Sequence, residues 1–572
     1  MIKGKLVLVL HGHLPYVIAH GKWPHGMDWL NEATAETYIP FLRVMDKLIA
    51  EGISPKITIG LTPVLSEMLA DEVFKDEFQN YLNLKVEAAQ VDAKEFSRVG
   101  DTSRYELALL WERYYSDVRT YFNDMLKRDI IGAYRKMQDD GHIEIITCAA
   151  THGYLPLLGE DTAVQAQIKL GVVTYKKHFG SQPRGIWLPE CAYRPSYNWT
   201  PPVEGFGGPR HRKGVEEFLS ENGLKYFIVD SHLLKGGRSI GVYLDRFEAL
   251  KQLWKNFESQ YQRVEEDTEK SSHRLYYTSS APGKGPVAFF TRDPDTGIQV
   301  WSGEHGYPGD GNYLDFHKKH YPGGHRYWKV TSAKSDLADK QVYEPEKVQA
   351  RILENALHFK NLVRSICLNE NFQDGSTPIV CAPFDAELFG HWWFEGPQWL
   401  YSVLKEISLD PELSAATMQE AFEENPPLHM VSLPEGSWGE GGFHWIWLND
   451  WTRWTWKHIY EDEKLMQEAA AKYNSRTDEP TASLLKQLAR ELVLLESSDW
   501  QFLISTWSAR DYAEMRFTQH HENFLLLLKL LNKAADGESL SDAEIESIKI
   551  IEERDKLFAD IDPKWWAELE YK

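Results

Sequence analysis

Residues 5–13 read Lys5-Leu6-Val7-Leu8-Val9-Leu10-His11-Gly12-His13, an apolar run that ends abruptly in two histidines. Six more short runs, rich in β-branched residues, share this form and stand at residues 56–61, 143–148, 185–188, 226–229, 287–290 and 378–381. Helical patterns lie between most of them. Continuous apolar strands that alternate with helices are typical of a parallel sheet covered on both faces. The sequence therefore predicts an α/β fold in which seven parallel strands form a closed or nearly closed barrel.

Polar residues follow the predicted strands at their carboxyl ends. In chain order they are His11 and His13, Thr62, His152, Glu190, Asp230 and His232, Arg292, and Asp385. Parallel barrels build their active sites from these strand ends. We therefore expect these side chains to gather at one face of the barrel and to form a candidate active site there.

The patterns also divide the chain, which is too long for one ordinary domain. Residues 1–410 contain all seven predicted strands and are interpreted as the barrel. Within them, residues 64–140 have helical spacing and no strand, and residues 233–283 form a long polar loop. Residues 411–572 have a helical pattern, which predicts a C-terminal all-α domain.

The composition narrows the range of partners. The 63 basic and 85 acidic residues give a net charge of −22, which argues against nucleic acid and suits a neutral substrate. No apolar run reaches the ~18 residues of a membrane span, and the first one is shorter than the roughly 7–15 residues of a secretory signal. We expect a cytoplasmic monomer without membrane association. The four cysteines form no C-x-x-C pair, so neither a zinc ribbon nor a disulfide framework is indicated.

Tryptophan is unusually abundant, with 21 residues. Many of them stand beside Gly, His or Asp, and clusters occur at residues 391–393 and 438–456. Aromatic faces stack on the apolar faces of sugar rings, while their polar edges bond hydroxyls. Any single tryptophan is more often a core residue, but the clusters favour a carbohydrate substrate.

Two carboxylates stand at the ends of predicted strands. Glu190 lies in Trp187-Leu188-Pro189-Glu190-Cys191-Ala192, and Asp385 lies in Phe384-Asp385-Ala386-Glu387-Leu388-Phe389-Gly390-His391-Trp392-Trp393. Acetal cleavage needs such a pair, one to attack or stabilise the oxocarbenium-like centre and one to protonate the leaving oxygen. A separation of ~5–5.5 Å would indicate retention of configuration. The alternative is that both are buried helix caps or ion-pair partners.

The histidines allow two interpretations. His11, His13 and His152 could together bind zinc, which would make the protein a metal-dependent carbohydrate hydrolase or deacetylase. They could equally donate hydrogen bonds to sugar hydroxyls. Four other histidines, His20, His25, His317 and His320, are interpreted as surface or loop residues.

The two carboxylate motifs occur in order with His11-Gly12-His13-Leu14-Pro15-Tyr16, His152-Gly153-Tyr154-Leu155-Pro156 and Ser437-Trp438-Gly439. This ordered set resembles the signature regions of glycoside hydrolase family 57, and in particular its 1,4-α-glucan branching enzymes. The resemblance runs through nearly the whole chain. It implies a (β/α)7 barrel with a helical insertion and a C-terminal helical domain, an α-glucan substrate such as amylose or glycogen, and no cofactor or metal.

The resemblance also implies roles for single residues. Glu190 would be the nucleophile and Asp385 the general acid/base. The expected substrate contacts are His11, His13, His152, Arg292, Trp301, Gly309, Trp438, Trp447 and Asp499. Asp499 lies in the predicted C-terminal domain, which would therefore complete the active site. Tyr243 resembles the tyrosine of the family's mobile catalytic loop, although this loop is longer here than the family pattern.

These roles imply a branching reaction, in which an α-1,4 linkage is cleaved and the chain is transferred to a 6-hydroxyl as an α-1,6 branch. Attack by water on the same intermediate would give hydrolysis, so an α-amylase or a 4-α-glucanotransferase stays open as an alternative. The metal-dependent hydrolase or deacetylase and a non-catalytic glucan-binding scaffold are the alternatives from other classes.

Overall fold

The computed structural model describes residues 2–237, 247–257, 265–281, 285–302, 306–332 and 334–570. Its centre is a parallel sheet in the order β4-β3-β2-β1-β10-β9-β7. The bounds are β1 (Gly4–Gly12), β2 (Ile57–Leu61), β3 (Ile143–Cys148), β4 (Ile186–Trp187), β7 (Tyr226–Asp230), β9 (Val287–Arg292) and β10 (Ile379–Asp385). A parallel bridge between Gly185 and Tyr226 joins the two ends of this order. The predicted seven-stranded α/β barrel is thus confirmed.

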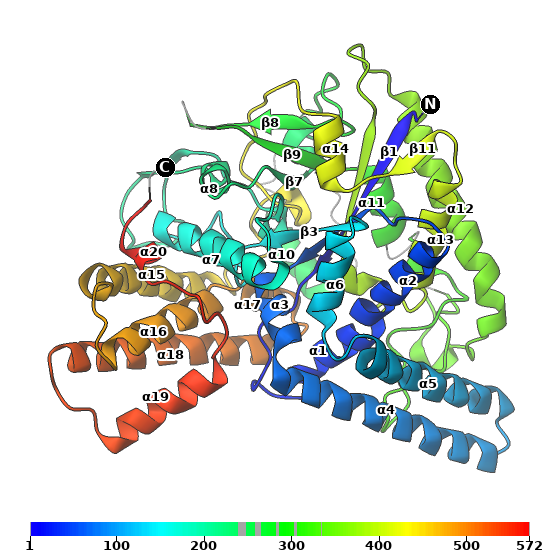
Figure 1. Cartoon of the computed structure of the whole chain (residues 1–572), viewed down its shortest axis with the longest axis horizontal. Helices are drawn as coiled ribbons and strands as arrows, with labels where there is room; N and C mark the ends of the chain where they lie inside the picture. The colour runs from blue at the N-terminus through cyan, green and yellow to red at the C-terminus, as the bar shows by residue number, and fades with distance from the viewer. Residues whose placement is uncertain are drawn as a thin grey trace.

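The barrel strands are apolar because helices cover them. Every residue of β1, β2, β3, β7 and β9 is buried, as expected for strands without a solvent face. Helices α6 (Ile130–Asp139), α7 (Asp161–Phe179) and α12 (Pro345–Asn369) pack directly on strands, and α13 (Gly396–Ser408) packs between α12 and α2 (Ile39–Ala50). Figure 1 shows these helices around the central strands.

Four short strands escaped the sequence analysis. The hairpin β5 (Tyr197–Trp199) and β6 (Arg210–Arg212) stands apart, β8 (Tyr276–Thr278) pairs antiparallel with β9, and β11 (Leu413–Ala415) pairs parallel with β1. Each has three residues, too few to display a period. They exist because a neighbouring strand offers backbone partners.

The helical insertion is a long antiparallel pair beside the barrel. Helix α3 (Pro63–Ala70) leads into α4 (Glu72–Arg98), which packs along α5 (Thr102–Thr120) (Figure 1). Before the insertion, between β1 and β2, the chain forms α1 (Met27–Ala33), which continues through a π-helical turn, η1 (Thr34–Tyr38), into α2. The Trp111 indole N–H donates to the Arg326 carbonyl, which ties α5 to the segment before α12.

The C-terminal part contains helices α15 (Arg453–Tyr473), α16 (Thr481–Leu495), α17 (Asp499–Thr506), α18 (Arg510–Ala535), α19 (Asp542–Arg554) and α20 (Lys564–Ala567). The expectation of helix from residue 411 onward is wrong up to residue 452. There the chain forms β11, then α14 (Met418–Glu424), then irregular backbone around η8 (Glu440–Gly442). Residues 413–415 form strand β11 because they pair with β1, so the sheet extends past the boundary expected at residue 410. The division into domains itself stays a prediction.

The loop after β7 is described only in part. It contains α9 (Ser231–Lys235), α10 (Glu248–Phe257) and β8. Tyr243, the expected residue of the catalytic loop, lies outside the described residues. Other helices of the chain are α8 (Val215–Glu221) and α11 (Pro294–Trp301). Among the helices that the structure describes, none combines the length and the apolar character that crossing a membrane requires.

One histidine departs from its expected place. His20 was expected at the surface, but its side chain is buried and its Nε2 lies 2.5 Å from Asp555 Oδ1. The reason is tertiary, because the loop after β1 is covered by the C-terminal helices.

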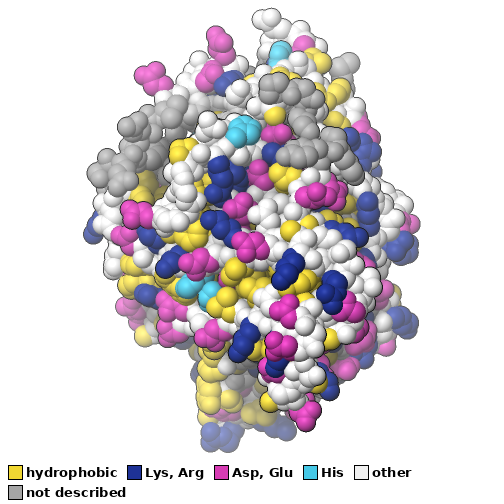
Figure 2. Space-filling model, turned by 90° about the vertical axis from the view of Figure 1, so that its left-hand side faces the viewer, with side chains coloured by type: hydrophobic (Ala, Val, Ile, Leu, Met, Phe, Trp, Pro, Cys, Tyr) yellow, Lys and Arg dark blue, Asp and Glu magenta, His cyan; other side chains and the backbone are white. Residues whose placement is uncertain are grey.

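The face that these helices present in Figure 2 carries interspersed acidic and basic side chains.

Candidate active site

Glu190 is held at the end of β4 by an unusual backbone. Its φ of 60° places it in the left-handed region, which is uncommon for a residue with a Cβ and often marks a functional site. The Glu190 carbonyl accepts from the Trp438 backbone N–H at 3.1 Å. The Trp438 indole Nε1–H donates to Glu190 Oε2 at 2.7 Å. Trp438, in the irregular segment after residue 425, therefore fixes both the backbone carbonyl and the side-chain carboxylate of Glu190.

The surroundings of Glu190 control its charge. Burial raises the pKa of Glu190 to about 8, the Trp438 hydrogen bond acts to lower it, and the charge of Asp385 raises it further. Asp385 is the last residue of β10 and pairs in register with His11 of β1. Both carboxylates are partly accessible, although most of their neighbours are buried. The two carboxylates are thus near enough for the charge of Asp385 to act on Glu190, while their shared cleft and their separation of ~5–5.5 Å stay predictions.

The three histidines form one stacked group beside this pair. His11 Nε2 lies 3.2 Å from His152 Nε2, and the rings of His13 and His152 stack at 4.0 Å with 14° between their planes. His11 also stacks on Trp187 at 4.4 Å. Burial lowers the pKa of both His11 and His152 well below the ordinary value. Neutral imidazoles can both donate and accept, which suits hydrogen bonds to sugar hydroxyls.

The group fits a metal ion poorly. A histidine binds a metal through a lone pair in its ring plane, so the parallel rings of His13 and His152 do not converge on one ion. Cys148, which lies near His11 and His152, is fully buried, and burial raises the pKa of its thiol. A thiol binds a metal as the thiolate, so binding here would have to release the Cys148 proton against this burial. The arrangement therefore favours the hydrogen-bonding interpretation.

Asp499 joins the C-terminal helices to the barrel. It begins α17, and its Oδ2 lies 2.8 Å from His13 Nε2 and accepts from the Ser497 hydroxyl at 2.6 Å. His152 Nδ1 lies 2.8 Å from the neighbouring Ser498 Oγ. The structure thus brings Asp499 to the histidines as predicted, although it lies more than 300 residues along the chain from His152.

Arg292 and Asp230 form a buried ion pair under Trp438. Arg292 Nη2 donates to Asp230 Oδ2 at 2.7 Å, and the guanidinium lies 5.3 Å from the centre of the Trp438 ring. Burial acts to raise the pKa of Asp230, but Arg292 and His232 outweigh it and hold that pKa below the ordinary value. Arg292 therefore supports the ring that holds Glu190, and its expected sugar contact stays a prediction.

Trp301, Trp447 and Gly309 belong to three further segments of the chain. Trp301 ends α11 and is buried, and Trp447 is buried with its ring stacked on Tyr154 at 4.6 Å. Gly309 lies in the short helix η5 (Tyr307–Gly309). Such buried rings shape the wall of a site, and their contact with sugar stays a prediction.

Two further residues of the site escaped the sequence analysis. Ser498 orients His152, and Glu387 accepts from the His13 backbone N–H at 3.0 Å. Their only signal in the sequence is proximity, since Ser498 precedes Asp499 and Glu387 follows Asp385 by two positions. Proximity alone does not reveal a partner from another strand.

Comparison with protein families agrees with this site. The model of glycosyl hydrolase family 57 matches residues 7–434, and the model described as 1,4-alpha-glucan branching enzyme, C-terminal, matches residues 458–566. A 1,4-alpha-glucan branching enzyme of Thermococcus kodakarensis is 42% identical over 559 residues, which cover 97% of this chain and 78% of the relative.

Solved structures show the same likeness. A branching enzyme of family 57 from Pyrococcus horikoshii has a TM-score of 0.87 at 40% identity, covering 100% of this chain and 98% of the other. An alpha-amylase from Thermotoga maritima has a TM-score of 0.79 at 28% identity, covering 99% and 100%. With a family model that spans most of its length and a site built from both matched regions, the chain belongs to glycosyl hydrolase family 57.

Proposed function

We propose that the chain is a 1,4-α-glucan branching enzyme with Glu190 as nucleophile and Asp385 as general acid/base. The observation that carries the proposal is the pair of carboxylates at the ends of β4 and β10, which are near enough for the charge of Asp385 to raise the pKa of Glu190. The match of the C-terminal helices to the branching-enzyme model supports branching over hydrolysis. The substrate is an α-glucan such as amylose or glycogen.

In the first step, Glu190 attacks the anomeric carbon while protonated Asp385 gives its proton to the leaving oxygen. The two carboxyls titrate as a pair, and the productive form carries the charge on Glu190 and the proton on Asp385. The indole N–H of Trp438 favours this form because it bonds the charged carboxylate. The left-handed backbone of Glu190 and its bond to Trp438 keep the attacking oxygen oriented.

In the second step, the charge of Glu190 is absent because it is esterified. The pKa of Asp385 then falls, since its neighbour is no longer negative. Asp385 removes the proton from an incoming 6-hydroxyl, and the sugar oxygen attacks the anomeric carbon to release Glu190. A glucan hydroxyl gives a branch and water gives hydrolysis, so branching requires that the cleft exclude water while admitting a chain.

The histidines and the C-terminal helices serve that requirement. Neutral His11 and His152 offer hydrogen bonds to the sugar without adding charge to the site. Asp499 brings α17 over the histidines, which narrows the access of solvent. We propose that His11, His13 and His152 contact the sugar bound at the −1 subsite. The proposal also includes the cytoplasmic location and the monomeric state expected from the sequence. Light scattering on purified protein tests the monomeric state.

The reaction is tested with amylose and three signals: iodine absorbance, reducing ends, and the α-1,6 anomeric proton by NMR. Glu190→Gln and Asp385→Asn serve as inactive controls. Falling iodine colour with growing α-1,6 signal and few reducing ends is the expected result. Reducing ends that rise in step with the loss of colour would make the protein an α-amylase, the second candidate that its likeness to the Thermotoga maritima enzyme supports.

A further inference from the structure

Glu387 is a buried carboxyl beside the catalytic acid/base that the proposed reaction does not use. Its side chain is 6% exposed. Its Oε1 accepts from the His13 backbone N–H at 3.0 Å and from the Tyr38 hydroxyl. One oxygen therefore joins three segments: the loop after β10, the loop after β1, and the π-helical turn η1. Glu387 lies two residues after Asp385 and fixes the backbone of a histidine of the site.

The π-helical turn holds the far end of the same loop as well. The Thr37 hydroxyl oxygen accepts from the His391 backbone N–H at 3.2 Å. At Gly390, a Cβ would lie 1.7 Å from the Glu36 carbonyl oxygen, so the two backbones touch where only glycine fits. A π-helical turn adds a residue to the helix and is often found at functional sites. Here it lets consecutive residues Glu36, Thr37 and Tyr38 all meet the loop that follows Asp385.

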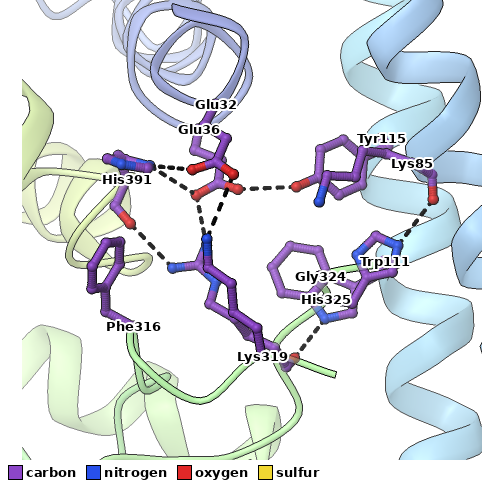
Figure 3. A pocket seen from close by; sticks show the side chains of 11 residues that line it. Glu32, Glu36, Lys85, Trp111, Tyr115, Phe316, Lys319, Gly324, His325 and His391 are labelled. Atoms are coloured by element: carbon purple, nitrogen blue, oxygen red, sulfur yellow. Dashed lines mark hydrogen bonds and ion pairs between the residues drawn. The ribbon is translucent and has the colours of Figure 1, made fainter. Parts of the chain in front are cut away.

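The helical insertion in turn anchors η1. Figure 3 shows Glu36 between His391 and Tyr115 of α5. Arg326 Nη2 donates to Glu36 Oε2 at 2.6 Å, and the Tyr115 hydroxyl donates to Oε1 at 2.9 Å. Arg326 Nη1 also donates to the His391 carbonyl at 3.1 Å.

Two more tyrosines hold the backbone of this turn. The Tyr134 hydroxyl donates to the Tyr38 carbonyl at 2.7 Å, and the Tyr114 hydroxyl donates to the Ala35 carbonyl at 3.0 Å. These donors come from α6 and α5, so the helices around η1 hold its backbone in addition to the loop that follows Asp385.

We propose that Glu387 is a positioning residue of the active site, through which Tyr38 and the π-helical turn fix His13 and the loop that follows Asp385. The inference rests on the proposed reaction only in that Asp385 is taken as the acid/base. It gives the helical insertion a role in the reaction, since the insertion supplies the contacts that hold η1.

The charge of Glu387 follows from the groups that face it. These are Tyr38 from η1, His13 from the loop after β1, and Asp385 from β10. Burial raises the pKa of Glu387 to about 8, the Tyr38 hydrogen bond lowers it, and Asp385 raises it. At neutral pH Glu387 is therefore mainly protonated. Above that pKa it becomes an additional negative charge that raises the pKa of Asp385.

The test compares Glu387→Gln with Glu387→Leu. Glutamine keeps an oxygen that accepts both bonds, so its kcat near pH 7 stays within about threefold of the parent. Leucine removes the acceptor, and we expect kcat to fall about tenfold to hundredfold with little change in KM, as small displacements of reacting groups cause. In Glu387→Gln the basic limb of the pH profile moves to lower pH, because the negative charge that Glu387 acquires above its pKa no longer raises the pKa of Asp385. Tyr38→Phe falls between the two.

Glu395 offers a matched control on the same segment. It is also buried, and its Oε1 accepts from a tyrosine hydroxyl, that of Tyr343 at 2.7 Å, and from the Leu314 backbone N–H at 3.0 Å. Glu395→Gln and Glu395→Leu should leave kcat and the pH profile within about threefold of the parent at equal folded fraction, which circular dichroism measures. Equal losses of kcat in Glu387→Leu and Glu395→Leu would overturn the inference, as would full activity of Glu387→Leu. An inactive parent protein would instead overturn the proposed function.

Discussion

At the scale of single residues, the charge on Glu190 depends on one indole N–H. The nucleophile has to be ionised, yet burial raises its pKa to about 8, and the hydrogen bond from Trp438 opposes this rise. A donor to a carboxylate stabilises the charged form and thereby lowers the pKa. Trp438 thus contributes to catalysis through the charge of Glu190 in addition to any contact with sugar.

Trp438→Phe should therefore raise the pKa of Glu190. The carboxylate form is lost at higher pH than in the parent, so the acidic limb of the kcat/KM profile moves to higher pH by about one unit, the scale of one charge-assisted hydrogen bond. Trp399→Phe is the control, because Trp399 is fully buried and its Nε1 meets no hydrogen-bond acceptor among the described residues. An unchanged limb in Trp438→Phe would contradict this account of Glu190.

At the scale of elements, the site depends on the contact between η1 and the loop after β10. Gly390 has a φ of 113° and leaves no room for a side chain against the Glu36 carbonyl. Such contacts between backbones cannot relax by a rotamer change. This contact fixes the position of the loop after β10 relative to η1, although the two segments lie about 350 residues apart in the sequence.

Gly390→Ala should displace this loop. We expect a loss of roughly 3 kcal/mol or more in unfolding free energy from combined strain and overlap, with kcat reduced more than KM is changed. Gly375→Ala tests the effect of backbone conformation alone, because Gly375 also has a positive φ, of 75°, but open space at its Cβ. Its cost should stay near ~1 kcal/mol. Chemical denaturation of both variants measures the difference, and equal costs would show that the contact with η1 is unimportant.

The elements also show what the sequence can predict. The barrel strands are continuous apolar runs because both faces are covered, and this signal is strong. Strands of three residues, such as β8 and β11, depend on a partner from elsewhere and carry no such signal. Glu190 and Asp385 could be predicted because strand ends collect catalytic groups. Glu387 could not, because its role arises from a π-helical turn that no local pattern indicates.

At the scale of the whole molecule, the C-terminal helices are joined to the barrel by a buried polar seam. His20 contacts Asp555 at 2.5 Å, and His520 of α18 lies 2.8 Å from Glu491 of α16. Arg516 Nη1 donates to the Tyr16 carbonyl at 2.7 Å. The same loop after β1 carries His13, so this seam and the His13–Asp499 contact support one another.

This seam makes stability depend on pH. Burial lowers the pKa of His20 from 6.5 to about 4, although its bond to Asp555 opposes the shift. His20 takes up a proton near pH 6.5 in the unfolded chain but only near pH 4 in the folded chain. The contribution of neutral, buried His20 to the free energy of unfolding is therefore complete above pH 6.5 and is lost as the pH falls from 6.5 to 4. Its size is about 3 kcal/mol.

Thermal unfolding followed from pH 7 to pH 4 should show this loss, and His20→Gln should make the decline shallower. His211→Gln is the control, because His211 is exposed. A decline of equal slope in His20→Gln and the parent would mean that other groups dominate the acid sensitivity of the seam.

The central claim, covalent catalysis by Glu190 with Asp385 as acid/base, is tested most directly by trapping the intermediate. An α-maltosyl fluoride carries a leaving group that needs little acid assistance, so Asp385→Asn should still form the glycosyl–enzyme but resolve it slowly without a base. Peptide mass spectrometry of this variant should find one maltosyl group, on Glu190. Turnover of the fluoride without an adduct, or an adduct on another residue, would contradict the claim.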